Sequence, residues 1–176
     1  MPLPDLTVET FLALRDAFFN NDGSPKPFTL RKKGNTQDDP LDVYITEVLK
    51  ARLNDAECQK SSGPLTSPDF VIYRRNECED VPRNSLSGDL SKMVAVEVKK
   101  LERSNGRIAR PTGMDYNTTP PCGTVRIYDL EDRPINVRGF YLFVCQEQTE
   151  KEEFIISSLT LCDGNILNDD FDLWVR

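Results

Sequence analysis

The chain has 176 residues and a formal net charge of −7 at pH 7, and 38% of its residues are hydrophobic, enough for one domain (residues 1–176) with a single core. It contains no histidine, which excludes serine and cysteine hydrolases with an imidazole base and histidine-ligated zinc enzymes. The negative charge argues against a protein that coats nucleic acid non-specifically, because such affinity comes from neutralised phosphates.

The beginning of the chain lacks the basic and then apolar pattern of a secretory signal peptide. The longest apolar runs, residues 93–98 and 140–145, fall far short of the roughly 18 residues that a membrane-spanning helix needs. We therefore expect a cytoplasmic protein without a membrane partner. The five cysteines are widely spaced and form no CxxC pair, so the sequence suggests neither a disulfide framework nor a zinc ribbon.

Two amphipathic helices are predicted in the first third of the chain. Apolar residues recur at helical spacing over residues 7–20, and an Asn-Asp-Gly turn follows. Asp39 is a suitable N-cap for a second helix over residues 40–56, which has Pro40 at its first position. The predicted apolar stripes consist of Val8, Phe11, Leu12, Leu14, Ala17 and Phe18 in the first helix, and of Leu41, Tyr44, Ile45, Val48, Leu49 and Leu53 in the second.

Four strands are predicted beyond the helices. A hydrophilic insert at residues 74–92 separates the β-rich run at residues 67–73 from the apolar run at residues 93–99. Residues 140–145 are nearly all apolar, as expected for a strand buried on both faces, and residues 154–159 form the next strand. This order of elements predicts an α/β fold with a central mixed β-sheet flanked by α-helices.

The most informative pattern is Asp69 at the start of one predicted strand and Glu97-Val98-Lys99 at the end of the next. Side chains alternate along a strand, so Glu97 and Lys99 project from one face. Val98 and Lys100 then project from the other face. If the two strands pair, Asp69 joins Glu97, and the two carboxylates provide the oxygen ligands that Mg²⁺ prefers. Such an ion activates water and stabilises the charge that develops on a phosphodiester during hydrolysis.

This pattern, in which Pro-Asp precedes Glu-Val-Lys, resembles the signature of PD-(D/E)xK nucleases, and residues 97–102 are similar to the form found in several type II restriction endonucleases. The resemblance covers residues 39–164 and implies a restriction-endonuclease-like fold. Asp42 matches an acidic helix position of that superfamily, as a carboxylate near the metal or a ligand of a second metal ion, with Glu47 as the alternative. Residues 171–176 are apolar and have no polar tail after them, which is compatible with a longer native protein.

The resemblance also implies an activity and a role for each motif residue. The chain would be a Mg²⁺-dependent type II restriction endonuclease that hydrolyses double-stranded DNA within a restriction-modification system. A homodimer is expected, because two related sites are the simplest way to cut both strands. Asp69 and Glu97 would ligate the metal, with the carbonyl of Val98 as a third ligand. Lys99 would orient or help to deprotonate the attacking water and stabilise the scissile phosphate.

The segment after the motif, residues 103–126, is polar and interrupted by proline and glycine, which predicts a loop. It leaves the catalytic strand directly, so we expect it to emerge where DNA lies across the site. Arginine and asparagine side chains read guanine and adenine edges and also contact phosphates. The predicted DNA-binding residues are Arg103, Asn105, Arg107, Arg110, Asn117, Thr118, Thr119 and Arg126.

Three alternatives stay open at this point. A repair nuclease or junction resolvase of the same superfamily would share the chemistry, although we expect such a chain to be more basic. A catalytically silent DNA-binding or protein-interaction module would share only the fold. The intact Asp69, Glu97 and Lys99 count against it, because an unpaired buried charge costs stability. The last alternative is coincidence, with Asp69 after a turn and the other two residues on a solvated strand face.

Overall fold

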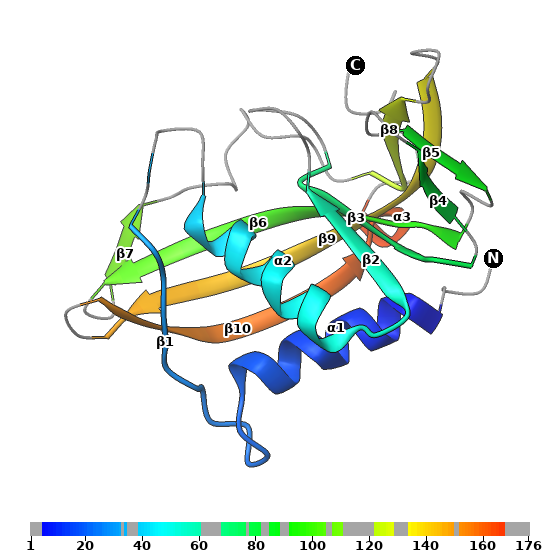
Figure 1. Ribbon diagram of the computed structural model, residues 1–176. Coiled ribbons are helices and arrows are strands. Elements are labelled where there is room, and N and C mark those ends of the chain that lie inside the picture. Colours follow the sequence, from blue (N-terminus) through cyan, green and yellow to red (C-terminus); the bar gives the residue numbers. More distant parts are fainter. Residues whose placement is uncertain are drawn as a thin grey trace, which may run out of the picture.

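The computed structural model of the protein contains an eight-stranded mixed sheet and two longer helices that pack on one of its faces (Figure 1). The structure describes residues 5–32, 34, 39–60, 68–76, 78–81, 85–88, 92–104, 107–110, 122–128, 134–149 and 152–167. Within these ranges, no helix combines the length and the apolar composition needed to cross a membrane. The predicted α/β class with a mixed sheet flanked by helices is confirmed.

Helix α1 (Asp5–Phe18) begins and ends two residues earlier than predicted. Val8 and Leu12, assigned to the apolar stripe from the sequence, are 52% and 38% exposed. The prediction was wrong for these two residues because the helix has apolar side chains on more than one side, and periodicity alone does not show which side meets the sheet. Buried residues recur every four positions at Leu6, Thr10, Leu14 and Phe18, and Thr7 beside them is also buried.

Helix α2 (Pro40–Arg52) begins as predicted. The Asp39 carboxylate caps it by accepting a hydrogen bond from the backbone N–H of Leu41 at 2.9 Å. The helix ends at Arg52 rather than at residue 56, because the chain turns there and enters a strand that the sequence analysis missed, β2 (Ala56–Lys60). The residues of α2 that are fully buried against the sheet are Leu41, Ile45 and Leu49.

The main sheet has the strand order β1-β10-β9-β6-β3-β2, with β7 paired to β6 and β8 paired to β9. Strand β6 is antiparallel to β3 and parallel to β9, so the two strands predicted to be neighbours around the motif do pair. The remaining strands of this sheet are β1 (Phe28–Thr29), β3 (Phe70–Arg74), β6 (Val94–Ser104), β7 (Arg107–Arg110), β8 (Thr124–Tyr128), β9 (Pro134–Gln148) and β10 (Glu153–Asp163).

Two polar segments contain more secondary structure than predicted. The insert at residues 74–92 includes β4 (Cys78–Val81) and β5 (Ser85–Gly88), an antiparallel pair outside the main sheet. The predicted loop at residues 103–126 is wrong in part, because it includes the end of β6, all of β7 and the beginning of β8. Strand pairing satisfies backbone polar groups whatever the side chains are, so a polar sequence does not exclude a strand.

The sheet separates two groups of buried side chains. One face packs against α1 and α2, and the other packs beneath the β8–β9 hairpin. Along β6, Val94 and Val96 belong to the helix side, whereas Ala95 belongs to the opposite side. Residues 97 and 99 continue the series of Ala95. The motif residues therefore project from the face that the helices do not cover.

The backbone packs closely where Cys122 meets the start of α3, beside this second face of the sheet. Helix α3 (Gly164–Leu167) begins at Gly164, where a Cβ atom would lie 2.0 Å from the carbonyl oxygen of Cys122. Cys122 itself contacts Tyr141 of β9 through its backbone N–H. Only glycine fits at this junction without a backbone shift.

We expect Gly164→Ala to lower the free energy of unfolding by about 1–3 kcal/mol, the usual range for overpacking. Gly34→Ala is the control, because the nearest atom to a Cβ there belongs to the Arg31 side chain at 3.9 Å. It should change stability by less than about 0.5 kcal/mol. Urea unfolding of both variants measures the difference, and equal stabilities would contradict the close packing of Gly164.

Candidate active site

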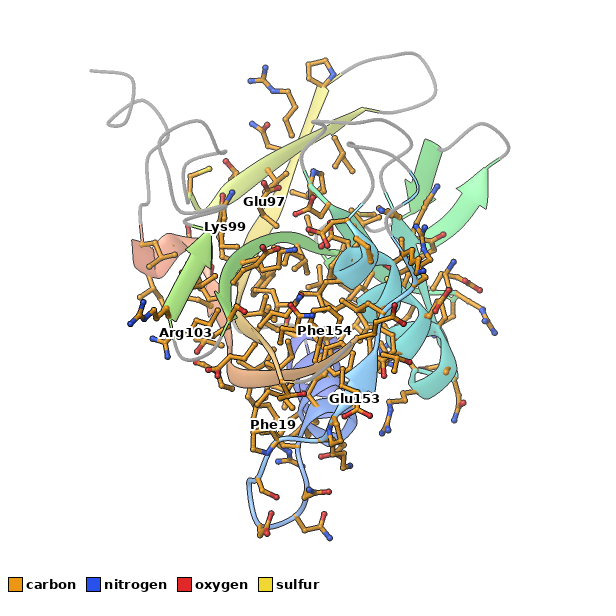
Figure 2. The ribbon with its side chains drawn as sticks, turned by 90° about the vertical axis from the view of Figure 1, so that its left-hand side faces the viewer. Phe19, Glu97, Lys99, Arg103, Glu153 and Phe154 are labelled. Atoms are coloured by element: carbon orange, nitrogen blue, oxygen red, sulfur yellow. The ribbon has the colours of Figure 1, made fainter. Side chains whose placement is uncertain are left out.

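Glu97 and Lys99 form a buried ion pair on the face of the sheet opposite the helices. Figure 2 shows them side by side on β6, away from Phe154, which packs on the helix side. Lys99 Nζ donates a hydrogen bond to Glu97 Oε1 at 3.1 Å, and only 5% and 11% of the two side chains are exposed. Breaking such a pair leaves an uncompensated buried charge, which is strongly destabilising.

Asp69 immediately precedes β3 and completes this group. The antiparallel register pairs Phe70 with Val96, which puts Asp69 opposite Glu97 across the two strands. Asp69 Oδ2 accepts a hydrogen bond from the backbone N–H of Val98 at 2.7 Å. The structure therefore brings together the three residues that the sequence motif singled out, although they come from positions 28 and 30 residues apart in the chain.

The charge of Glu97 is close enough to Asp69 to disturb the ionisation of Asp69. Burial is the main cause that raises the pKa of Asp69 to about 6, and the charge of Glu97 acts in the same direction. The hydrogen bond from Val98 and the charge of Lys99 lower this pKa. A cation held between the two carboxylates would relieve the repulsion and lower the pKa of Asp69.

Asp42, in the first turn of α2, lies within electrostatic reach of Asp69. Burial raises the pKa of Asp42 to about 7, and the charges of Asp69 and Asp39 also raise it. Glu47, the alternative acidic residue on this helix, is exposed. The environment therefore distinguishes Asp42 from Glu47 as the helix carboxylate of the site.

Lys60 and Tyr141 belong to the same neighbourhood and were not identified from the sequence. Lys60, at the end of β2, pairs in register with Phe70, and its charge lowers the pKa of Asp42 and of Asp69. Its strand was not predicted: the predicted second helix ended at residue 56, and no element was assigned to residues 57–60. In the structure, buried Ala56 and Cys58 alternate with more exposed residues at the spacing of a strand.

Tyr141 is the register partner of Glu97 in the parallel β6–β9 pair and is fully buried. Its hydroxyl accepts a hydrogen bond from the backbone N–H of Cys122 at 3.1 Å. Burial raises the pKa of Tyr141, so the hydroxyl keeps its proton at neutral pH and remains a potential donor. The sequence analysis placed Tyr141 in a buried strand. It gave no indication that Tyr141 would lie beside Glu97, because that depends on the register between two strands that are distant in the chain.

Asp69 and Glu97 fit a magnesium site that water and substrate would complete. A carboxylate offers about four lone-pair positions, so the hydrogen bonds already made leave room for a metal. Mg²⁺ is commonly held by one or two carboxylates and keeps several waters. In the part of the chain that the structure describes, no group of three or more acidic or cysteine side chains is arranged to hold an ion. The predicted roles of the Val98 carbonyl and of Asp42 as ligands stay predictions.

The predicted DNA-binding residues do not lie in one loop. Arg103 is in β6, where its guanidinium lies 3.8 Å from Glu147 of β9, and Arg107 begins the adjacent β7. Arg126 is in β8 and pairs with Asn136 of β9. Since Asn136 and Glu147 are eleven residues apart, about 35 Å of strand separates Arg126 from the two other arginines. Arg110 is in β7 without a described side chain, and Asn105, Asn117, Thr118 and Thr119 lie outside the described residues.

The arrangement has the components of metal-assisted hydrolysis of an anionic ester. Two carboxylates can hold a divalent cation, and an ammonium group beside them can contact a phosphate oxygen. Comparisons of the chain with protein-family models, curated proteins and solved structures found no match. The functional interpretation therefore rests on these residues and their geometry.

We expect Asp42→Asn to stabilise the protein, and to do so increasingly as the pH rises from about 4 to about 8. The pKa of Asp42 is about 7 in the folded protein and near its ordinary value of 3.8 in the unfolded chain. The folded state therefore holds its proton more tightly, and the wild type loses stability as the pH rises through this window, whereas the amide does not.

At pH 8 the gain should be a few kcal/mol, since each pKa unit is worth about 1.4 kcal/mol. Urea unfolding at pH 4, 6 and 8 measures it. Glu47→Gln is the matched control, because it removes the same charge from an exposed position of the same helix. A pH-independent difference between Asp42→Asn and the wild type would show that Asp42 is not a buried acid.

Proposed function

We propose that the protein is a Mg²⁺-dependent endonuclease that hydrolyses phosphodiester bonds in double-stranded DNA, with PD-(D/E)xK chemistry and a restriction-endonuclease-like fold. The observation that supports this most directly is the meeting of Asp69, Glu97 and Lys99 on one face of two adjacent strands. The second predicted helix and the four predicted strands correspond to α2, β3, β6, β9 and β10, in that order along the chain. The chain contains no histidine, so mechanisms that activate a nucleophile with an imidazole base are excluded.

Each residue of the site has a distinct task in this proposal. Asp69 is held in place by the N–H of Val98 and, with Glu97, would bind Mg²⁺. The ion would supply positive charge to the scissile phosphate and lower the pKa of a water molecule. Lys99 would stabilise the negative charge that develops on the phosphate and orient the attacking water. Because these three side chains already lie together before substrate binds, bringing them together costs little during the reaction once the phosphate has access to them.

The burial of the Glu97–Lys99 pair limits how a DNA phosphate can reach it. With only 11% and 5% of the side chains exposed, a DNA phosphate reaches them only if a neighbouring segment moves aside. The same burial favours one alternative, a catalytically silent DNA-binding module in which the pair is structural. The two functions differ in outcome, because the silent module would bind DNA and leave it intact.

Arg103 and Arg107 suggest how such an enzyme would contact DNA beyond the site. They lie at the β6–β7 connection, where Ser104 pairs with Arg107. Arginines in this position can bind phosphates or read guanine bidentately.

We propose a site-specific type II enzyme that acts as a cytoplasmic homodimer. Incubation with mixed plasmids and Mg²⁺ tests the specificity: discrete fragments support it, and a smear indicates a non-specific or repair nuclease.

We expect Asp69→Asn and Glu97→Gln each to lower the single-turnover rate of DNA cleavage by at least about a hundredfold, because the loss of a metal ligand removes several kcal/mol of barrier reduction. Glu57→Gln is the control, since it removes a carboxylate from the edge strand β2, where Glu57 pairs with Arg75. Thermal unfolding identifies variants that fail for lack of stability. Folded variants of both site residues that keep more than about a tenth of the rate would exclude them as metal ligands.

Metal replacement tests the proposed cofactor independently of substitutions. Mg²⁺ should support cleavage, Mn²⁺ should support it with relaxed specificity, and Ca²⁺ should permit DNA binding with little turnover, because Ca²⁺ has looser geometry and polarises water less. Gel-shift and cleavage assays in each ion measure the two steps. Full activity in excess chelator would end the metal hypothesis.

A further inference from the structure

Lys100 lies on the helix side of β6, immediately after the candidate catalytic Lys99. Its ammonium group is 2.5 Å from Asp39 Oδ2 and 2.8 Å from Glu102 Oε1, and 13% of its side chain is exposed. An ion pair at this depth is weakly screened by solvent, so its geometry is more restrictive than that of a surface pair. Lys100 therefore ties the central strand to the residue that caps α2.

Asp39 uses its two carboxylate oxygens for two different purposes. Oδ1 accepts the hydrogen bond from the Leu41 N–H that caps α2, while Oδ2 contacts Lys100. The first turn of the helix and strand β6 thus share one carboxylate. A shift of Lys100 would act on the helix start, because the cap and the ion pair cannot move independently.

Asp42 lies in the turn that this contact holds. The charges that influence Asp42 include those of Asp69 on the site side and of Asp39 and Lys100 on the helix side. Asp69 in turn accepts the N–H of Val98, two residues before Lys100 in β6. Lys100 and Val98 of β6 are therefore linked through α2 and Asp69: Lys100 contacts Asp39, Asp39 caps the turn that contains Asp42, and Asp69, whose charge acts on Asp42, accepts the Val98 hydrogen bond.

We propose that Lys100 is a positioning residue of the candidate active site: through Asp39 it fixes the start of α2, and with it the distance of the Asp42 carboxylate from Asp69 and the metal. This inference rests on the proposed function. Lys100 does not reach the site itself, since strand alternation directs it to the opposite face from Glu97 and Lys99. Its effect is on metal binding and on the rate in Mg²⁺.

The test compares four variants of the full chain. Lys100→Met keeps most of the side-chain volume and removes the charge. Asp39→Asn removes the same ion pair but keeps an N-cap acceptor, because asparagine caps helices as well as aspartate does. Lys100→Arg keeps the positive charge at this position. Glu102→Gln is the matched control, since it removes the other carboxylate that contacts Lys100 and leaves the contact with α2 intact.

Three quantities are measured for each variant: the dissociation constant of Mg²⁺ by calorimetry without DNA, the single-turnover cleavage rate at saturating Mg²⁺, and the thermal unfolding temperature. We expect Lys100→Met and Asp39→Asn to weaken Mg²⁺ binding about 10–100-fold, the usual effect of losing a residue that orients metal ligands. Lys100→Arg should recover most of this loss, and Glu102→Gln should stay within about threefold of the wild type.

The outcomes separate the inference from the proposed function. If the wild type binds Mg²⁺ and cleaves DNA but Lys100→Met and Asp39→Asn behave like Glu102→Gln, the positioning role is wrong and the nuclease proposal stands. A lower unfolding temperature with unchanged Mg²⁺ affinity would assign Lys100 to stability alone and also overturn the inference. If the wild type neither binds Mg²⁺ nor cleaves DNA, the proposed function fails and the positioning role fails with it.

Discussion

Side-chain alternation along β6 is the constraint on which both the core and the candidate site depend. Val94 and Val96 pack against the helices, while Glu97 and Lys99 project from the other face. A shift of the strand by one residue would exchange the two sets, exposing apolar side chains and burying charges against the helices. The hydrophobic contacts of α1 and α2 with the sheet therefore also specify which way the motif points.

Keeping the acidic groups of the site buried costs free energy that the fold must offset. Burial is the main cause of the raised pKa values of Asp42 and Asp69; the charge of Asp69 further raises the pKa of Asp42, and the charge of Glu97 further raises that of Asp69. Lys60 and Lys99 reduce this cost without removing it. A protein without a use for these carboxylates would be more stable with neutral residues in their place. The cost of burying these carboxylates therefore agrees with the cation that we propose for the site.

The two faces of β6 make different ion-pair contacts: Lys99 lies on the face of the site, and Lys100 lies on the face that the helices cover. Lys100 connects β6 to the cap of α2, whereas Lys99 contacts Glu97 of the same strand. From the strand alternation alone, Lys100 has no expected function. Its importance follows from the helix start that it holds, and this contact spans 61 residues of the chain. A lysine outside the motif thus becomes relevant only once the layers are assembled.

Local patterns in the sequence determined the α/β class, the cap at Asp39, the strand that contains Glu97 and Lys99, and the face that these two residues share, because each depends on neighbouring residues and a fixed repeat. Tertiary structure alone decided that Asp69 lies opposite Glu97, that Tyr141 lies beside it, and that the predicted polar loop contains strands. These features depend on the register between distant strands. Backbone hydrogen bonds are alike at every position of a strand, so only packing across the whole sheet selects the register.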